Sequence, residues 1–404
     1  MQQIAHKVRK QIADWRQTIA RELSGETVGG LSGENQVEIY YDGDRVFGAM
    51  LDAIESAKSH IHLEMYMFLS DTIGASFAEA LSAKAREGVS VRVIYDSIGS
   101  SAADPMQWAH MRDAGVKIIE YRPVAPWRKR AGIFGRNHRK NLIVDGTTGF
   151  TGGMNIGDPW SPEQYRENAW RDTQIRLIGP AANHLDTLFA DSWKYCTDET
   201  LELVESDSIP NRELTSQVTE LGGCRCMVVG SRGLGSRKQI RKLFSVHLDK
   251  ARHSVKMTMP YFVPPRRLRK SMRRASQRGV NIALLLPRDS DVAVVDWLRE
   301  GLYPSLLNWG VRVLEYLGPI LHAKTMVIDD NVAIVGSNNF DILSVLMNRE
   351  TAIVIFDDQV AEELNRQWEN DLMLSERVAS DWEGLRPWWR LWLAKLGCFL
   401  LRRL

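Results

Sequence analysis

Two stretches of the chain carry the same chemically capable residues at the same intervals. Each has a His, a Lys two positions later, and then an Asp, a Gly and an Asn. The first set is His138, Lys140, Asp145, Gly152 and Asn155, and the second is His322, Lys324, Asp329, Gly336 and Asn339. Paired imidazoles with flanking cations and amides suit phosphoryl transfer at a phosphodiester, in which one imidazole attacks phosphorus and the other protonates the leaving alcohol. The two Lys and two Asn side chains would stabilise the transition-state charge, and no metal is required.

Each set alone is incomplete, so we expect two pseudo-equivalent domains to meet about a two-fold axis and form one site. A catalytic imidazole is usually oriented by a carboxylate on its far ring nitrogen. A carboxylate follows each motif in a similar setting, in Arg171-Asp172-Thr173 and in Arg349-Glu350-Thr351. We predict that Asp172 orients His138 and that Glu350 orients His322.

The local pattern predicts a β-hairpin at each motif. The apolar residues after each His-x-Lys read as a strand, and the turn residues Asp145-Gly146 and Asp329-Asp330-Asn331 lead into a returning strand. That return would bring Asn155 and Asn339 beside their own His-Lys pairs. The two Asp residues lie in the turns, so we interpret them first as turn and hydrogen-bonding residues and only second as catalytic ones.

Other groupings of metal-binding residue types are weaker. Lys is a poor metal ligand at neutral pH, and no third imidazole lies near either motif. His60 and His62 share a predicted strand face with Glu64, and we interpret them as structural. Cys224 and Cys226 lack a second ligand pair, so we expect neither a zinc site nor any other cofactor.

Strand and helix patterns alternate through the chain. In the first half the predicted strands are 37–41, 60–68, 89–95 and 116–121, and the predicted helices are 45–58, 73–87 and 104–114. This order repeats in the second half: Trp309-Gly-Val-Arg-Val-Leu-Glu-Tyr, for example, echoes Ala114-Gly-Val-Lys-Ile-Ile-Glu-Tyr. The first copy also carries an aromatic and basic insertion before its motif, around Trp127. The pattern predicts two α/β/α domains with mixed, largely parallel sheets.

The same reading divides the 404 residues into five parts. They are an amphipathic helix within 1–33 that ends in a Gly-rich break, a first domain 34–196, an acidic linker 197–223, a second domain 224–380 and a Trp/Leu/Arg-rich tail 381–404. The net charge of +2 excludes a strongly basic nucleic-acid coat. Four Cys without paired spacing favour a reducing compartment, and we expect neither a secretory signal nor a spanning helix.

Both motifs resemble the paired HxKxxxxD signature of the phospholipase D superfamily, over about Gln36 to Gln367. Pro260-Tyr-Phe-Val-Pro264, Gly336-Ser-Asn-Asn-Phe-Asp341 and Asn348-Arg-Glu350 are similar to bacterial cardiolipin synthases. The resemblance implies a phosphatidyl-histidine intermediate on His138, with His322 as general acid. It also implies that the acceptor is the hydroxyl of a second phosphatidylglycerol.

The sequence departs from that pattern in three places. Gly153 stands where the second motif has Ser337, which we count among the site residues, and Leu343 stands where many relatives carry Arg. The two N-terminal spanning helices of the best-known cardiolipin synthases are missing, so the chain resembles a shorter, peripheral branch.

A lipid enzyme without a spanning helix must dock on the membrane. The tail mixes Trp, Leu and cations over a stretch too short to span comfortably, as in-plane interfacial helices do, although it could instead close over the core. The Arg-rich stretch 266–274 and the insertion add cationic surfaces for anionic lipid. We therefore predict a peripheral protein on the cytoplasmic face of a bacterial inner membrane.

Three other functions remain open at this point. Water could accept the phosphatidyl group, which would make the protein a phospholipase D, since both reactions share every catalytic residue. A nuclease of the same superfamily would use identical chemistry, but the charge balance and the tail disfavour nucleic acid. A non-catalytic lipid-binding scaffold is disfavoured because both motifs are intact.

Overall fold

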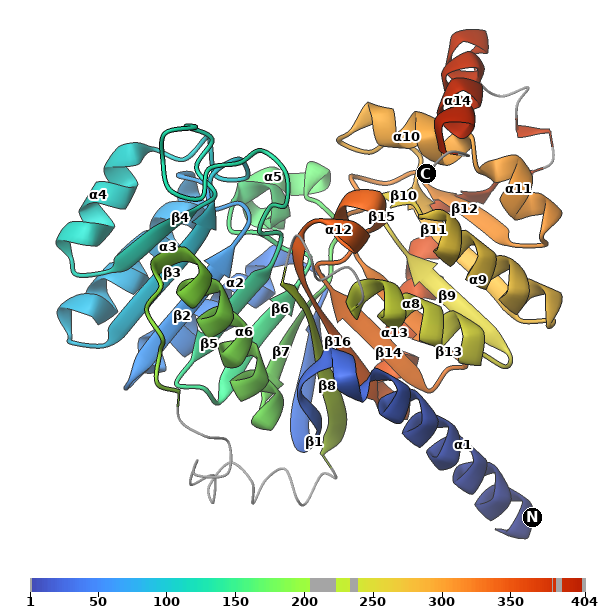
Figure 1. Ribbon diagram of the computed structural model, residues 1–404, viewed down its shortest axis with the longest axis horizontal. Helices are drawn as coiled ribbons and strands as arrows, with labels where there is room; N and C mark the ends of the chain where they lie inside the picture. Colours follow the sequence, from blue (N-terminus) through green and yellow to red (C-terminus); the bar gives the residue numbers. More distant parts are fainter. Residues whose placement is uncertain (1, 204–222, 233–238, 380, 383–386, 402–404) are drawn as a thin grey trace.

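The computed structural model describes residues 2–203, 223–232, 239–379, 381–382 and 387–401 (Figure 1). The first half contains α1 (Gln2–Leu23), β1 (Thr27–Tyr40), α2 (Gly43–Ser56), β2 (His60–Met65), α3 (Thr72–Arg86), β3 (Ser90–Asp96), α4 (Pro105–Asp113), β4 (Lys117–Tyr121), β5 (Lys140–Val144), β6 (Thr148–Gly152), α5 (Pro162–Tyr165), β7 (Gln174–Ile178) and α6 (Pro180–Thr197). The predicted α/β alternation and the first hairpin are confirmed. The predicted linker falls largely on 204–222, outside the described residues.

The second half repeats this order. It contains β8 (Cys224–Arg232), α8 (Gln239–Lys250), β9 (Ser254–Thr258), β10 (Phe262–Val263), α9 (Arg266–Gln277), β11 (Asn281–Pro287), α10 (Ala293–Glu300), α11 (Tyr303–Asn308), β12 (Arg312–Tyr316), β13 (Thr325–Ile328), β14 (Val332–Gly336), β15 (Phe340–Asp341), α12 (Ile342–Leu346), β16 (Arg349–Phe356), α13 (Asp358–Leu372), β17 (Ser375–Arg377) and α14 (Trp388–Leu401). The duplication therefore extends through both folded halves. None of the described helices is both long and apolar enough to cross a bilayer.

The strands of both halves join into one 15-stranded mixed sheet. Its order is β17-β12-β11-β9-β13-β14-β16-β8-β1-β7-β6-β5-β2-β3-β4. Parallel pairing among these strands is confined to β2-β3-β4 and β9-β11-β12. The expectation of a largely parallel sheet is wrong, because the two motif hairpins and the strands that join the halves are antiparallel. Short turns can connect only antiparallel neighbours, and those hairpins occupy the middle of each half.

Strand β1 joins the halves. Its end, residues 36–40, pairs with β7, and its start, residues 27–35, pairs with β8. The predicted Gly-rich break is wrong, because Gly29 and Gly30 lie inside β1. They have φ values of 67° and 79° at a shift in register between Val28 and Leu31. Gly adopts this backbone conformation without steric cost, so the strand bulges there and continues.

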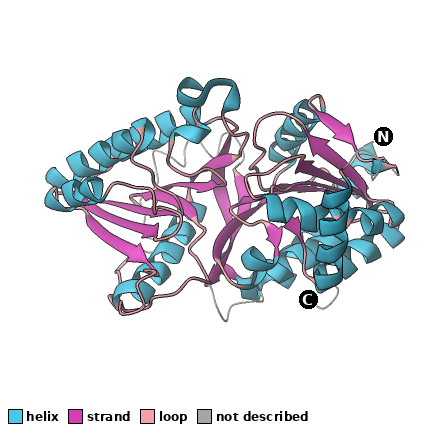
Figure 2. Ribbon diagram, turned by 90° about the horizontal axis from the view of Figure 1, so that it is seen from above, coloured by secondary structure: helices cyan, strands magenta, loops and turns pink. Residues whose placement is uncertain are grey.

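Helices cover both faces of the sheet in each half (Figure 2). One core lies under α2, α3 and α4, and another lies between the sheet and α1, α8, α9 and α11. A third contains Leu185 of α6 and Leu364 of α13 together with Leu177 and Ile353 of the sheet, so it spans both halves. Burial of this shared apolar core opposes separation of the halves and thereby holds their motifs in a constant relation.

Candidate active site

The two motif histidines sit where the halves meet. The backbone N–H of His138 donates to the carbonyl oxygen of Arg349 at 2.9 Å, and that of His322 donates to the carbonyl oxygen of Arg171 at 2.7 Å. Bridges between Asn137 and Arg349 and between Arg171 and Leu321 continue this pairing. Each histidine segment therefore lies beside the carboxylate segment of the opposite half.

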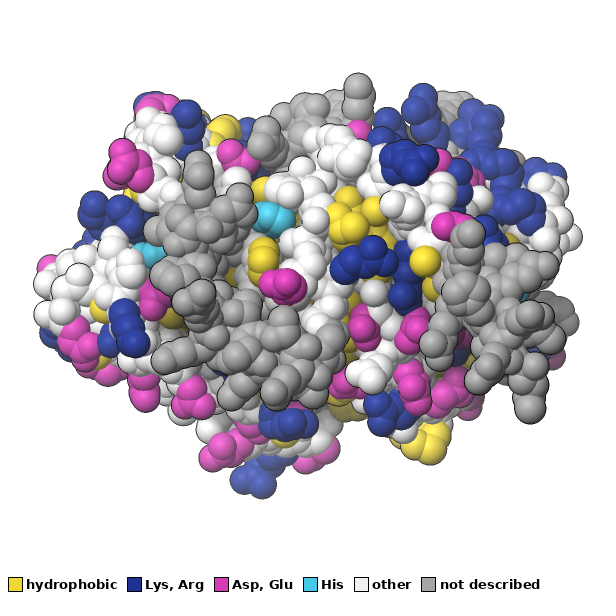
Figure 3. All heavy atoms as spheres, turned by 90° about the horizontal axis from the view of Figure 1, so that it is seen from below, with side chains coloured by type: hydrophobic (Ala, Val, Ile, Leu, Met, Phe, Trp, Pro, Cys, Tyr) yellow, Lys and Arg dark blue, Asp and Glu magenta, His cyan; other side chains and the backbone are white. Residues whose placement is uncertain are grey.

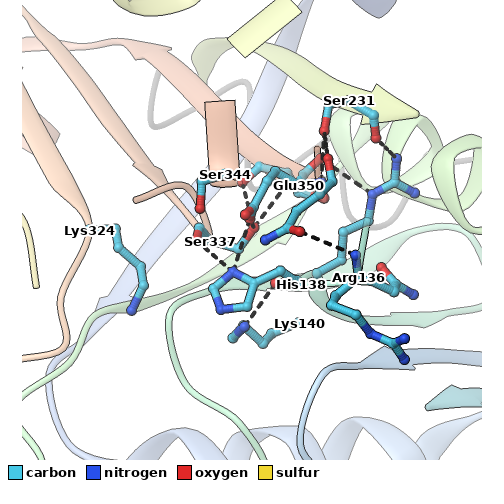
Figure 4. Close-up of polar contacts among 12 residues, drawn as sticks. Arg136, His138, Lys140, Ser231, Lys324, Ser337, Ser344 and Glu350 are labelled. Atoms are coloured by element: carbon cyan, nitrogen blue, oxygen red, sulfur yellow. Dashed lines mark hydrogen bonds and ion pairs between the residues drawn. The ribbon is translucent and has the colours of Figure 1, made fainter. Parts of the chain in front are cut away.

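The imidazole–carboxylate pairs are crossed between the halves. Nδ1 of His322 lies 2.6 Å from Oδ2 of Asp172. Nδ1 of His138 lies 3.1 Å from Oε2 of Glu350 (Figure 4). The predicted partners, Asp172 with His138 and Glu350 with His322, are therefore wrong. The physical reason is the backbone pairing, which places each carboxylate next to the histidine of the other half. Each carboxylate still has the kind of role that was predicted. It bonds to Nδ1 of an imidazole, which orients the ring and leaves Nε2 free to react.

Both lysines are buried beside the imidazoles. Nζ of Lys140 donates to the carbonyl oxygen of His138 at 2.8 Å and lies 4.9 Å from the centre of the Tyr66 ring. Nζ of Lys324 lies 2.8 Å from Nδ1 of His322. Burial, together with the positive charge of Lys324, lowers the pKa of Lys140 to about 7, and burial lowers the pKa of Lys324 to about 8.

The charges of the two halves act on one another. Lys324 belongs to the second half, yet it lowers the pKa of both Lys140 and His138 in the first. In Figure 4 the amine of Lys324 points into the space that the His138 ring and Lys140 also face. The two motifs therefore contribute to a single electrostatic site, as the duplication predicts.

Burial keeps both imidazoles neutral. It lowers the pKa of His322 to about 4, and it also lowers the pKa of His138, with the neighbouring lysines adding to both shifts. Lys324 and His322 lower the pKa of Asp172 despite its burial, so this carboxylate stays ionised. A neutral imidazole whose Nδ1 is tied to a carboxylate has a free lone pair on Nε2, which is the form that a nucleophile needs.

The two carboxylates are supported differently. The hydroxyl of Ser337 donates to Oε2 of Glu350 and accepts from the backbone N–H of Thr351 at 3.1 Å. In the first half a Cβ on Gly153 would lie 2.0 Å from Oδ1 of Asp172. The absence of a hydroxyl at position 153 is therefore steric, because the carboxylate itself occupies the space that a side chain would need.

The motif aspartates are structural, as the first interpretation proposed. The Asp145 carboxylate accepts from three backbone N–H groups of residues 58–60 at 2.8–2.9 Å. Asp329 accepts in the same way from residues 252–254 at 2.7–2.9 Å. Both also adopt φ of 51° in their hairpin turns. Each therefore ties its hairpin to the start of the neighbouring strand, and within the described residues neither forms a hydrogen bond or ion pair with its own motif His or Lys.

The motif asparagines are buried, and their bonding is unequal. Oδ1 of Asn155 accepts from the backbone N–H of Met67 at 3.1 Å. Within the described structure, Oδ1 of Asn339, both amide atoms of Asn338 and Oε1 of Glu350 are buried without a hydrogen-bond partner. Unsatisfied buried polar atoms are costly, so their gathering beside the second motif fits a site completed by a bound ligand.

Several supporting residues escaped the sequence reasoning. Arg136 forms a buried pair with Asp96, which also accepts from the backbone N–H of Asn137 at 2.9 Å. Glu64 accepts from Nδ2 of Asn137 at 2.8 Å and pairs with the guanidinium of Arg139. These contacts hold the residues on either side of His138. The sequence does contain a signal for these contacts. Arg136 and Arg139 lie next to an apolar strand, and buried arginines require buried acidic partners.

Aromatic residues also surround the imidazoles. The Trp160 indole N–H donates to Oδ2 of Asp172 at 3.1 Å, and the Trp170 ring centre lies 5.4 Å from that of His322. The Tyr66 ring lies 4.8 Å from that of His138. These rings exclude water from the imidazoles and strengthen the electrostatic interactions there.

One histidine group lies outside the site. His60 Nε2 and His62 Nδ1 bond to the two carboxylate oxygens of Asp186 at 2.8 and 2.6 Å. These three side chains offer ligand atoms within 4.8 Å of one another, so they are the one group among the described residues with the composition of a metal site. Here they tie β2 to α6, which fits the predicted structural role of the two histidines.

Comparison with known proteins supports this architecture. The family model described as cardiolipin synthase, PLD-like domain, matches residues 50–193 and 245–372, one segment in each half. Cardiolipin synthase 1 of Bacillus anthracis is 31% identical over 340 residues, which are 83% of this chain and 66% of that protein. The major cardiolipin synthase of Bacillus subtilis is 33% identical over 359 residues, which are 88% of this chain and 73% of that protein. The chain thus spans just under two thirds of the length of the first of these relatives.

Solved structures show the same fold at low sequence identity. Phosphatidylserine synthase of Haemophilus influenzae superposes with a TM-score of 0.69 at 15% identity, covering 95% of this chain and 97% of that one. Polyphosphate kinase of Porphyromonas gingivalis gives a TM-score of 0.59 at 17% identity, covering 86% and 49%. From the family model in both halves and the relatives aligned across them, we conclude that the chain belongs to the phospholipase D-like family of the cardiolipin synthases.

Proposed function

We propose that the protein is a phosphatidyltransferase that makes cardiolipin from two molecules of phosphatidylglycerol. The observation that carries this proposal is the crossed pairing of His138 with Glu350 and of His322 with Asp172. It supplies two oriented imidazoles beside two buried lysines. The alignment with relatives named cardiolipin synthases supports the choice of substrate.

In the first step, Nε2 of His138 attacks the phosphorus of one phosphatidylglycerol. The bond from phosphorus to the headgroup glycerol oxygen breaks, and His322 gives that oxygen a proton. In the second step, His322 takes a proton from the hydroxyl of a second phosphatidylglycerol. The resulting oxygen attacks phosphorus, the bond to His138 breaks, and cardiolipin is formed with glycerol as the other product.

The lysines prepare this site for an anionic substrate. Burial lowers the pKa values of Lys140 and Lys324 to about 7 and about 8, and a bound phosphodiester anion favours their charged forms. The same anion raises the pKa of His322 and so favours the protonated form that serves as general acid. Substrate binding therefore brings both the compensating charge and the catalytic proton into a site that is otherwise kept nearly neutral.

The edge of the molecule that carries the site also carries exposed apolar side chains. At the top of Figure 1 lie α5, α12, α10, α14 and the teal loop after β4, and α12 directly precedes the Glu350 strand. Trp127 and Phe134 of that loop are 83% and 64% exposed. On α14, Arg390 pairs with Glu300 of α10 and Ala394 is buried, while Trp388 and Trp392 point outward. We propose that this edge rests on the membrane, with α14 both packed on the protein and available to lipid.

A reconstituted assay tests the reaction. Purified protein is incubated with phosphatidylglycerol vesicles, and cardiolipin, phosphatidic acid and glycerol are measured. We expect cardiolipin and glycerol in equal amounts, and no product from His138→Ala or His322→Ala. Phosphatidic acid without cardiolipin would instead establish a phospholipase. Activity that is lost in EDTA and restored by zinc would overturn the metal-free mechanism.

Vesicle flotation tests the docking edge. Trp388→Ser combined with Trp392→Ser should reduce binding to anionic vesicles, because two exposed indoles are removed while the packed face of α14 stays intact. Leu31→Ser is the control, since this 39% exposed side chain belongs to β1, a strand labelled at the bottom of Figure 1 and away from α14. Equal binding of both variants and the unmodified protein would refute the role of α14. Phosphatidylglycerol as the lipid partner and the cytoplasmic face of a bacterial inner membrane stay predictions.

A further inference from the structure

A groove lies on the second half, between α9 and α11. Its volume is about 440 Å³, within the usual range for ligand sites. One wall is cationic, and the other wall and the floor are apolar. The groove therefore offers two kinds of surface to the same ligand.

The cationic wall comes from a single helix face. Arg266, Arg269, Lys270 and Arg273 of α9 follow one another at helical spacing and line the groove. Arg266, Lys270 and Arg273 form no ion pair with any acidic side chain in the described part of the chain, whereas Arg274 on the neighbouring face pairs with Asp249 at 2.9 Å. Lys and Arg side chains gather over this end of the second half (Figure 3). Like charges held this close repel one another, so an anion in the groove would stabilise them.

The apolar surface lies directly opposite. Phe262, Leu302, Leu306 and Trp309 line the groove, and the first three are buried side chains of the second-half core. A small inorganic anion would leave this surface unused. A ligand that contacts both walls must carry a negative group and an apolar chain.

We propose that this groove binds one anionic phospholipid, with its phosphate on the α9 cations and an acyl chain on the apolar wall. The choice of a membrane lipid over another amphiphile rests on the proposed function. The site is separate from the catalytic one. Phe262 lies in β10, and the ring of its neighbour Tyr261 lies 6.3 Å from that of His322. Tyr261 directly precedes β10, so this short segment contacts the catalytic site through one side chain and lines the groove with the next, and it separates the two sites.

This wall also connects the lipid to the catalytic residues. Phe262 stacks on Phe340 at 5.4 Å, and Phe340 directly follows Asn339 of the second motif. β10 and β15 pair through these same residues. An acyl chain packed against Phe262 would stabilise the β10–β15 pair, which lies directly after Tyr261 and Asn339 in the sequence. Lipid in the groove should therefore favour the positions that these two residues hold in the proposed active site.

Two matched double variants test the cationic wall. Arg266→Gln with Arg273→Gln removes two charges that line the groove. The control, Arg267→Gln with Arg274→Gln, removes two charges from the same helix that line only a polar surface toward α8. A third variant, Ser305→Trp, fills the groove from an exposed position without changing charge. For the binding measurements each is made in the His138→Ala/His322→Ala protein, so that no lipid is consumed, and for the reaction assay each is made in the protein with both histidines intact.

Binding of dihexanoyl phosphatidylglycerol below its micelle concentration is measured by calorimetry. We expect the groove variant to weaken one class of sites roughly tenfold, because two exposed charge contacts are lost. The Ser305→Trp variant should remove that class, and the control should retain it. Equal isotherms for groove and control variants would overturn the proposal, as would binding of glycerol 3-phosphate or dihexanoyl phosphatidylcholine as tight as that of dihexanoyl phosphatidylglycerol.

The outcome is independent of the reaction assay. If the protein makes no cardiolipin but the groove class persists in the catalytically inactive background, the proposed function fails and the lipid site stands. If cardiolipin is made at equal rates by the groove and control variants and their isotherms match, the lipid site fails and the proposed function stands.

Discussion

The crossed pairing predicts which chemical step each carboxylate supports. Asp172→Asn should impair His322, the proposed general acid, and Glu350→Gln should impair His138, the proposed nucleophile. Both replacements keep the shape of the side chain and remove its charge. A charge-assisted hydrogen bond contributes about 1.5–3 kcal/mol, and about 1.4 kcal/mol corresponds to a tenfold change in rate, so each variant should lose roughly 10- to 150-fold in activity.

The leaving group distinguishes the two roles. A phosphatidyl ester of p-nitrophenol releases an anion that needs no protonation, so it bypasses the general acid but still needs the nucleophile. Pre-steady-state release of p-nitrophenolate should therefore be nearly normal in Asp172→Asn and remain slow in Glu350→Gln. With phosphatidylglycerol as substrate, both variants should be slow.

Two outcomes would refute this reasoning. If Asp172→Asn stays slow with the activated ester while Glu350→Gln recovers, Asp172 serves the nucleophile and the assignment of roles is reversed. If neither recovers, the carboxylates do not divide between acid and nucleophile. Asp186→Asn is the matched control, a buried carboxylate that bonds two histidines outside the site. It should lower thermal stability without changing the dependence on leaving group.

Three further predictions follow from the same geometry. The pKa values of Lys140 and Lys324 are about 7 and about 8, and a bound phosphodiester anion raises them. KM should therefore rise with pH from about 7 upward, by up to about tenfold per pH unit for each lysine, and a KM that is constant from pH 6 to 9 would contradict this prediction. Asp329→Ala should lower the free energy of unfolding by about 1–3 kcal/mol in denaturant titrations, since three backbone N–H groups lose their acceptor, and a loss of activity without a loss of stability would argue for a catalytic role. Gly153→Ala should abolish activity, because its Cβ would lie 2.0 Å from Oδ1 of Asp172; a fully active variant would show that this carboxylate is not held as described.

Much of the site could be predicted from the repeat. Identical spacing in both copies identified His138 and His322 with their lysines, and the similar sequences Arg-Asp-Thr and Arg-Glu-Thr after the motifs identified the two carboxylates. The hairpins followed from apolar alternation and from turn residues, and the turn role of Asp145 and Asp329 followed from their position. These are local properties, and each depends on only a few consecutive residues.

Only the tertiary structure decided which copy supplies each partner. A repeat has the same pattern whether Asp172 bonds to His138 in its own half or to His322 in the other, so spacing cannot distinguish the two arrangements. The backbone pairing of Asn137 with Arg349 and of Arg171 with Leu321 decides it, and these bonds join residues far apart in the chain. Contacts between distant segments also decide that β1 and β8 join the two halves into a single sheet. The need for Gly at position 153 likewise depends on such a contact, with the carboxylate of Asp172. The sequence by itself determined which side chains make up the proposed catalytic set, and the packing of the two halves determined how they are paired, because that pairing depends on contacts between segments that no local pattern encodes.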